Sequence, residues 1–221
     1  MCGRYAVTLP AEAMATLFGS ADRPNSPPRW NVAPTQTVPI IAIGKAGDRR
    51  IVSARWGLRP AWMAKDFPTG PLFNARGETV ADKPSFAKAF ARKRCLVPAD
   101  GFYEWQRDGK ARIPYFVARP DKQPVAFAGL WEAAPDAQGG TLVSMAIITC
   151  AAAPSFAPIH DRFPVVLDQE KWADWLSNET PKAELQSLLI APDDGFMIPN
   201  RVRDHVNKVT NDDATCFAAI N

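Results

Sequence analysis

The chain begins Met1-Cys2-Gly3, and Cys2 has the most distinctive chemistry in the sequence. Met1 is usually removed when the second residue is small, which would leave a cysteine with a free α-amine and a thiol on adjacent carbons. An aldehyde condenses with such an amine to an imine, and the thiol then closes a five-membered thiazolidine ring. The amine titrates at about 7.7–8 and the thiol at about 8.5, so both are partly reactive near neutrality. The sequence therefore predicts an aldehyde trap, the alternative being a frayed terminus with an incidental cysteine.

Three further polar residues have side chains suited to this chemistry. Glu104 interrupts an apolar and aromatic run, where desolvation would raise its pKa and let it move protons near neutrality. His160 stands in a proline-bounded loop, and Asn74 precedes an alanine and an arginine. Each has an ordinary alternative, since Glu104 could pair with a surface cation, His160 could be a surface residue and Asn74 could belong to a turn.

The elements that must position these residues are mostly strands joined by short turns. Alternating or β-branched runs predict strands, and capping and periodicity predict helices. The first helix is expected to be capped by Thr8 and to end at about Phe18, with Gly19 just after it. Strands are expected at residues 3–8, 38–43, 51–56, 95–98, 102–106, 113–118, 125–131 and 142–149, with strand-like pieces at 196–198 and 206–209. Residues 23–34 are expected to form a proline-rich loop. This order predicts an α+β fold with a mostly antiparallel, barrel-like β-sheet and a few flanking helices, in a single domain over residues 1–221.

Composition limits the classes of function. The 221 residues include 26 basic and 23 acidic side chains, a net charge of +3 that only weakly favours a polyanionic partner. Four widely spaced cysteines form no Cys-x-x-Cys pair and only two histidines are present, so we expect no metal ion and no cofactor. No apolar run is long enough for a signal peptide or a membrane span, so we expect a cytoplasmic protein with reduced thiols and no membrane partner.

Seven short segments together resemble the family of SOS-response-associated peptidases, also described as abasic-site processing proteins. The resemblance extends from Cys2 to about Val209, nearly the whole chain, and one departure is Phe163, where many members have methionine. The matching segments are residues 2–5, 30–34, 56–58, 74–76, 94–105, 128–132 and 160–162. Each segment alone is weak evidence, but seven in the family's order with cysteine at position 2 are specific.

The resemblance implies a protein that crosslinks itself to abasic sites in single-stranded DNA, whose opened deoxyribose carries an aldehyde. Cys2 would supply the amine and the thiol of a thiazolidine, and Glu104 would move protons between the intermediates. Asn74 would hold the amine or the sugar oxygens, and His160 would assist ring opening and the imine steps. If the thiol did not close the ring, β-elimination of the 3′ phosphate would give AP-lyase activity.

The resemblance also implies two kinds of DNA contact and a monomeric protein. Cations would bind phosphates and flat side chains would stack on bases or wedge between them. The expected cations are Arg4, Arg76 and Arg162. Trp62 and Pro34 are expected to contact the bases. For Phe102 two roles are open: a wedge between bases, or packing in the core. Asn31 and Thr149 match positions near the site, with a binding or structural role left open.

Three other functions fit parts of the sequence. An amino-terminal-nucleophile amidohydrolase would use the Cys2 thiol on an amide with the α-amine as base, but we find no matching Asn-Gly oxyanion-hole segment. A peptidase would pair Cys2 with His160 or Glu104 and would act either on peptide substrates or only on the chain's own Met1. A non-enzymatic single-strand DNA-binding module would leave Cys2 idle.

Overall fold

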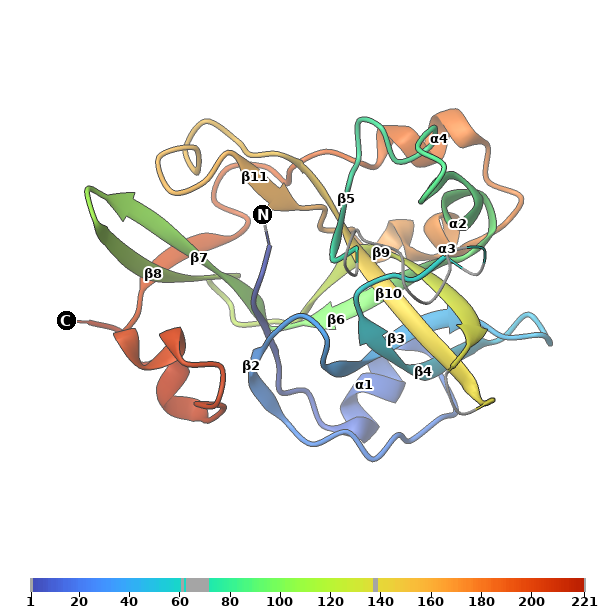
Figure 1. Ribbon diagram of the computed structural model, residues 1–221, viewed down its shortest axis with the longest axis horizontal. Helices are drawn as coiled ribbons and strands as arrows, with labels where there is room; N and C mark the ends of the chain where they lie inside the picture. The colour runs from blue at the N-terminus through green and yellow to red at the C-terminus, as the bar shows by residue number, and fades with distance from the viewer. Residues whose placement is uncertain (1, 61, 63–71, 137–138, 221) are drawn as a thin grey trace.

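The computed structural model describes residues 2–60, 62, 72–136 and 139–220 (Figure 1). It confirms the expected α+β class with mostly antiparallel sheets. Five strands close into a barrel: β3 (Thr37–Ile43), β4 (Arg49–Trp56), β6 (Arg94–Ala99), β9 (Val125–Pro135) and β10 (Thr141–Ala151). The ring closes because β10 pairs antiparallel with β9 and parallel with β4.

The barrel interior is apolar and tightly packed. Every residue of β6 is buried, and a Cβ added at Gly129 of β9 would lie 2.8 Å from Cys95 Sγ and from Val97 Cγ2, so only glycine fits there. Two short strands extend the barrel at β10: β5 (Asn74–Arg76) pairs parallel with it and β11 (Arg162–Pro164) pairs antiparallel. These two strands carry or adjoin several of the expected site residues.

A second, five-stranded antiparallel sheet stands beside the barrel. Its strand order is β12-β8-β7-β1-β2, and Figure 1 shows the β7–β8 hairpin reaching away from the barrel. The strands are β1 (Tyr5–Val7), β2 (Arg29–Val32), β7 (Gly101–Asp108), β8 (Ala111–Ala118) and β12 (Ile198–Arg201). The chain therefore places its first strand inside a sheet, between β7 and β2.

Short helices flank the barrel. They are α1 (Ala11–Phe18), α2 (Ala87–Arg92), α3 (Trp172–Leu176), α4 (Lys182–Ser187) and the 3₁₀ turn η1 (Gln169–Lys171). Helix α1 begins after Pro10, so the expected cap at Thr8 is wrong: the Thr8 N–H instead donates to Asp100 Oδ2 at 2.7 Å. Its end at Gly19 (φ 66°) is as the sequence predicts. No helix in the described part of the chain is both long and apolar enough to cross a bilayer.

Two expectations about irregular segments are corrected. The predicted loop at residues 23–34 contains strand β2, because Asp212 accepts the backbone N–H groups of Trp30 and Asn31 and pairs with Arg29. The predicted strand at residues 206–209 begins instead as part of the 3₁₀ helix η2 (Asp204–Asn207), which is followed by η3 (Ala214–Phe217). These turns pack on a small second core, made of Ala6, Tyr103, Val202, Val206 and Cys216.

Candidate active site at the start of the chain

Strand β1 carries Cys2 into the interior of the protein. Tyr5 pairs with Phe102 of β7 on one side and with Val32 of β2 on the other, so the residues just before it are held in place. Cys2 is 0% exposed, and its carbonyl oxygen accepts a hydrogen bond from Asn74 Nδ2 at 2.9 Å. A frayed amino terminus is therefore not what the structure describes. Strand β5 brings Asn74 to Cys2, where its side chain contacts the carbonyl oxygen of Cys2.

The environment of the Cys2 thiol keeps it protonated. Burial raises its pKa far above the ordinary value, and the nearby carboxylate of Glu104 adds to the rise. The Cys2 Sγ atom lies 3.9 Å from the carbonyl oxygen of Arg4, which accepts a weak hydrogen bond from the thiol. A thiol in this state needs a base before it can attack an electrophile.

Glu104 is placed to be that base. It lies on β7, opposite Tyr115 of β8, and its side chain is 5% exposed. Desolvation raises the pKa of the Glu104 carboxyl to about 7. A carboxyl with this pKa can both accept and release a proton near neutral pH, and its burial argues against the exposed, ion-paired alternative.

His160 lies across the same space from Glu104. Its Nδ1 atom accepts the backbone N–H of Arg162 at 2.9 Å, which leaves the hydrogen of the neutral ring on Nε2. Desolvation lowers the pKa of His160, although Asp161 Oδ1 lies 2.9 Å from Nδ1 and favours the charged ring. Desolvation outweighs this attraction because the Asp161 side chain is 86% exposed and water screens its charge.

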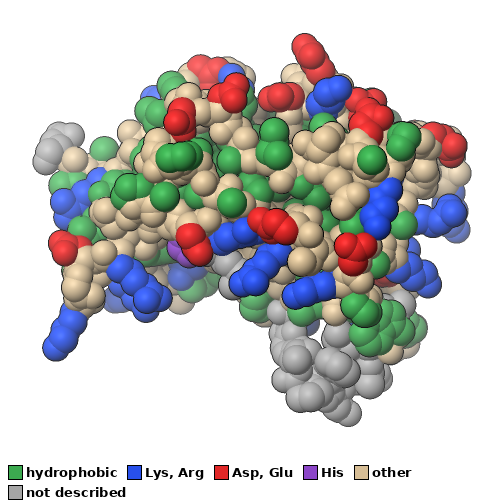
Figure 2. Space-filling view, turned by 90° about the horizontal axis from the view of Figure 1, so that it is seen from above, with side chains coloured by type: hydrophobic (Ala, Val, Ile, Leu, Met, Phe, Trp, Pro, Cys, Tyr) green, Lys and Arg blue, Asp and Glu red, His purple; other side chains and the backbone are tan. Residues whose placement is uncertain are grey.

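A pocket of about 610 Å³ joins these groups to solvent. Its walls are Gly3, Arg4, Glu104, Trp105, Arg107, Arg112, His160 and Asn207. Cys2 directly precedes the lining residue Gly3, and the side chain of Asn74 donates a hydrogen bond to the Cys2 carbonyl oxygen. On the face seen in Figure 2, basic side chains form a band, interspersed with acidic ones, and a histidine lies within it.

Arg4 is the cation most firmly held at the pocket. Its guanidinium donates to Asn31 Oδ1 at 2.7 Å and to the carbonyl oxygen of Val206 at 3.0 Å, and it lies 5.6 Å from the centre of the Trp105 ring. Partial burial lowers its pKa. Asn31 is 0% exposed and its Nδ2 donates to the carbonyl oxygens of Val206, Lys208 and Asn211. Asn31 therefore positions Arg4 and the carboxyl-terminal segment and does not itself reach the pocket.

Arg76 and Arg162, the other two expected cations, differ in whether the guanidinium is already bound within the protein. Arg76 is exposed at the end of β5, opposite Thr149 of β10. Arg162 forms two hydrogen bonds to the Glu78 carboxylate, at 2.6 and 2.9 Å, and a third to the carbonyl oxygen of Thr149 at 2.7 Å. Arg162 thus fastens β11 to β10 in this structure, and Thr149, which is fully buried, serves as its anchor.

The residues expected to contact DNA bases differ in how exposed they are. Trp62 is 56% exposed and Pro34 is half-buried in the turn after β2. Phe102 is fully buried and packs edge-on against Phe163, with ring centroids 4.8 Å apart. Core packing is therefore the role of Phe102, and Phe163 contributes to the same aromatic cluster.

Sequence reasoning did not single out four residues of the pocket wall: Trp105, Arg107, Arg112 and Asn207. The pair Asp108-Gly109 was the available signal, since it predicts a tight hairpin and Gly109 has a φ of 56°. In that hairpin Arg107 pairs directly with Arg112. Trp105 Nε1 donates to Asn207 Oδ1 at 2.7 Å, a contact between segments a hundred residues apart that no local pattern reveals.

Comparison with known proteins identifies the family. Residues 1–209 match the family described as SOS response associated peptidase (SRAP). The chain is 36% identical over 227 residues to the abasic site processing protein YoaM of Bacillus subtilis, covering 100% of this chain and 99% of that one. It is 31% identical to the abasic site processing protein YedK of Escherichia coli, over 85% of each chain.

A solved structure agrees with these similarities. The crystal structure of a protein from Bacteroides thetaiotaomicron superposes with a TM-score of 0.88 at 27% identity, covering 99% of this chain and 100% of that chain. The match of the family over residues 1–209, together with full-length relatives above 30% identity, shows that this chain belongs to the SOS response associated peptidase family.

Proposed function

We propose that this protein processes abasic sites in DNA by forming a thiazolidine between Cys2, after removal of Met1, and the aldehyde of the opened deoxyribose. The observation that carries the proposal is that Glu104 and His160 line one pocket together with Gly3, which directly follows the buried Cys2, while Asn74 bonds the Cys2 backbone. The names of YoaM and YedK, abasic site processing proteins, support the choice of substrate.

The first stage is imine formation. The Cys2 α-amine adds to the aldehyde carbon to give a carbinolamine, and loss of water leaves the C=N bond. The departing hydroxyl needs a proton and the amine must lose one. Glu104, with a pKa of about 7, is suited to both transfers, and the Nε2–H of His160 is suited to donate to the sugar oxygen.

The second stage closes the ring. The Cys2 sulfur adds to the imine carbon as its proton passes to Glu104, and the imine nitrogen takes up a proton, so the step is neutral overall. Because burial holds the thiol in its protonated form, this proton transfer depends on the Glu104 carboxylate. An imine that is not closed in this way is open to β-elimination of the 3′ phosphate, which is the route to AP-lyase activity.

Single-stranded DNA is the proposed partner, bound as a substrate by a monomer. Arg4, Arg107 and Arg112 supply positive charge at the pocket, and exposed Arg76 supplies it at β5. Trp105 and exposed Trp62 offer flat surfaces for bases. Arg162 is already ion-paired with Glu78, which argues that it positions β11 and does not contact phosphate.

The test is incubation of mature protein with single-stranded DNA that carries one abasic site, followed by a denaturing gel without reductant. We expect a heat-stable shifted band with the abasic strand, no band with the intact strand, and no band for Cys2→Ala. Mass spectrometry of the protein checks that Met1 is absent. Absence of the band from protein that has lost Met1 would overturn the proposal, and a glutaminase assay would then examine the amidohydrolase alternative.

A further inference from the structure

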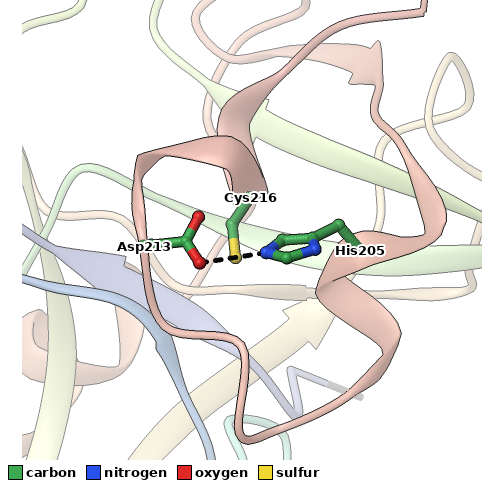
Figure 3. A group of neighbouring side chains, drawn as sticks. All are labelled: His205, Asp213 and Cys216. Atoms are coloured by element: carbon green, nitrogen blue, oxygen red, sulfur yellow. Dashed lines mark hydrogen bonds and ion pairs between the residues drawn. The ribbon is translucent and has the colours of Figure 1, made fainter.

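Outside the pocket, three side chains of the carboxyl-terminal segment bring metal-binding donor atoms together. Figure 3 shows His205 on η2 and Asp213 and Cys216 at η3 pointing toward one another. The His205 Nε2 atom lies 3.0 Å from Asp213 Oδ2, and these two atoms and the Cys216 sulfur all lie within 4.8 Å of one another. This is the one such group among residues 2–60, 62, 72–136 and 139–220.

We propose that His205, Asp213 and Cys216 bind a divalent transition-metal ion of the zinc class. Tetrahedral zinc sites have bonds of about 2.0–2.3 Å, which place neighbouring donors about 3.3–3.7 Å apart. The His205–Asp213 separation is slightly below that range and no pair of these donors is more than 4.8 Å apart, so side-chain adjustments of about 1 Å admit an ion. A sulfur and an imidazole nitrogen favour zinc-like ions over magnesium or calcium, which prefer oxygen donors.

Charge and protons balance in this site. A thiolate, a carboxylate and a neutral imidazole neutralise a dication, with water completing the coordination. Binding releases the Cys216 proton to solvent, and the hydrogen of the His205 ring moves from Nε2 to Nδ1. The Nδ1 atom lies 3.2 Å from Asn211 Nδ2, a donor that also bonds the carbonyl oxygen of His205 at 2.7 Å. The metal-bound form of the ring therefore requires the Asn211 amide to turn, so that its oxygen accepts the Nδ1–H.

The donors are also supported and accessible. Asp213 Oδ1 accepts the N–H of Thr215 at 2.8 Å, which holds the carboxylate with Oδ2 toward His205. The Asp213 side chain is 54% exposed and that of His205 33% exposed, whereas Cys216 is fully buried. An ion therefore enters from the solvent side and meets the sulfur at the base of the site.

The consequence of a bound ion is a tie between η2 and η3. This part of the chain rests on a second core of only five buried residues, and small cores commonly need such a staple. Val206 and Asn207, next to His205, provide the carbonyl oxygens that accept from Arg4. The ion would thereby fix one wall of the pocket. Asp213 and Cys216 lie beyond residue 209, where the family match ends.

Cobalt provides the direct test, since thiolate-bound Co²⁺ absorbs in the near ultraviolet and a tetrahedral site absorbs in the visible. Full-length protein stripped with a chelator is titrated with Co²⁺ under reducing conditions. We expect both bands to saturate at one equivalent and to disappear when zinc is added. Cys216→Ser should abolish the near-ultraviolet band, and Cys150→Ser, which alters another buried thiol, should retain it.

Two further variants make the outcome decisive. His205→Gln and Asp213→Asn change partly exposed side chains, so folding is retained, and each should weaken binding at least about tenfold. The Cys2 aminothiol is itself a chelator, so Cys2→Ser must keep the bands. Zinc at 100 times its wild-type Kd should raise the Tm of wild type by about 5–10 °C and that of Asp213→Asn by at most about half as much. Absence of bands in wild type, bands that survive Cys216→Ser, or bands lost with Cys2→Ser would overturn the proposal.

Discussion

Replacing Glu104 with glutamine should make the protein more stable at alkaline pH. The folded protein holds the pKa of Glu104 at about 7, against an ordinary value of 4.5, because desolvation disfavours the carboxylate. The folded state therefore binds this proton more tightly than the unfolded state does. The favourable contribution is fully present below pH 4.5 and is lost as pH rises through 7.

The size of the effect follows from that interval. At about 1.4 kcal/mol per pH unit, the difference between 4.5 and about 7 corresponds to about 3 kcal/mol. Glutamine resembles the protonated carboxyl, so the variant avoids this loss. The two proteins should unfold with similar free energies at pH 4.5, and the variant should lead by up to about 3 kcal/mol at pH 8. Attraction to the amino terminus favours the carboxylate and is already included in this pKa.

Urea denaturation at pH values from 4.5 to 8.5, followed by circular dichroism, measures the gap. Glu179→Gln, a change at an exposed loop residue, controls for the loss of one negative charge. If the stability of Glu104→Gln relative to wild type did not change between pH 5 and pH 8, the carboxyl would not be desolvated as the structure describes. In the DNA assay the same variant should also form its adduct more slowly at every pH, since it lacks the proton carrier.

The other expected outcomes concern the chemistry and the DNA contacts. Cys2→Ser should form an imine that borohydride traps, but no adduct that survives denaturation without reductant; a stable adduct would refute ring closure by sulfur. Arg76→Ala should weaken binding to abasic and intact strands alike and reduce the salt slope by about 1, whereas an effect on the abasic strand alone would place Arg76 at the lesion. Asn31→Ala removes the acceptor for Arg4 and the donor to three carbonyl oxygens, and should lower the free energy of unfolding by about 3 kcal/mol in urea titrations. Unchanged stability would contradict the positioning role of Asn31.

Local patterns predicted the parts of the fold that local physics controls. The β-branched runs around residues 38–43 and 51–56 do form the β3–β4 hairpin, and Gly19 does end α1. Strand β2 was missed because its contacts are not local: it pairs with β1, and the carboxylate of Asp212, about 180 residues away in the chain, accepts two of its backbone N–H groups. The 3₁₀ helix η2 was missed for the same reason, since Asn31 draws the carbonyl groups around it inward.

Some residues of the candidate site could be proposed from the sequence, and others could be found only in the structure. Residue type and the family's segments identified Cys2, Asn74, Glu104 and His160, and the structure brings these four together. Sequence could not distinguish an arginine that is free to bind DNA phosphate from one that is already ion-paired, because the Glu78 partner of Arg162 lies 84 residues away. Nor could it place Trp105 beside Arg4, which requires the order of strands in the second sheet.

The position of β1 between β7 and β2 determines how force would travel through a crosslinked protein. DNA attached at Cys2 pulls on a strand that begins three residues later and is hydrogen-bonded on both edges. A pull along that strand loads its hydrogen bonds in parallel, as shear, and does not open them one at a time. A translocating motor that meets the adduct would therefore confront the mechanically strongest direction of the sheet. A protease would need to cut downstream of β1, leaving a peptide that still carries Cys2 on the DNA.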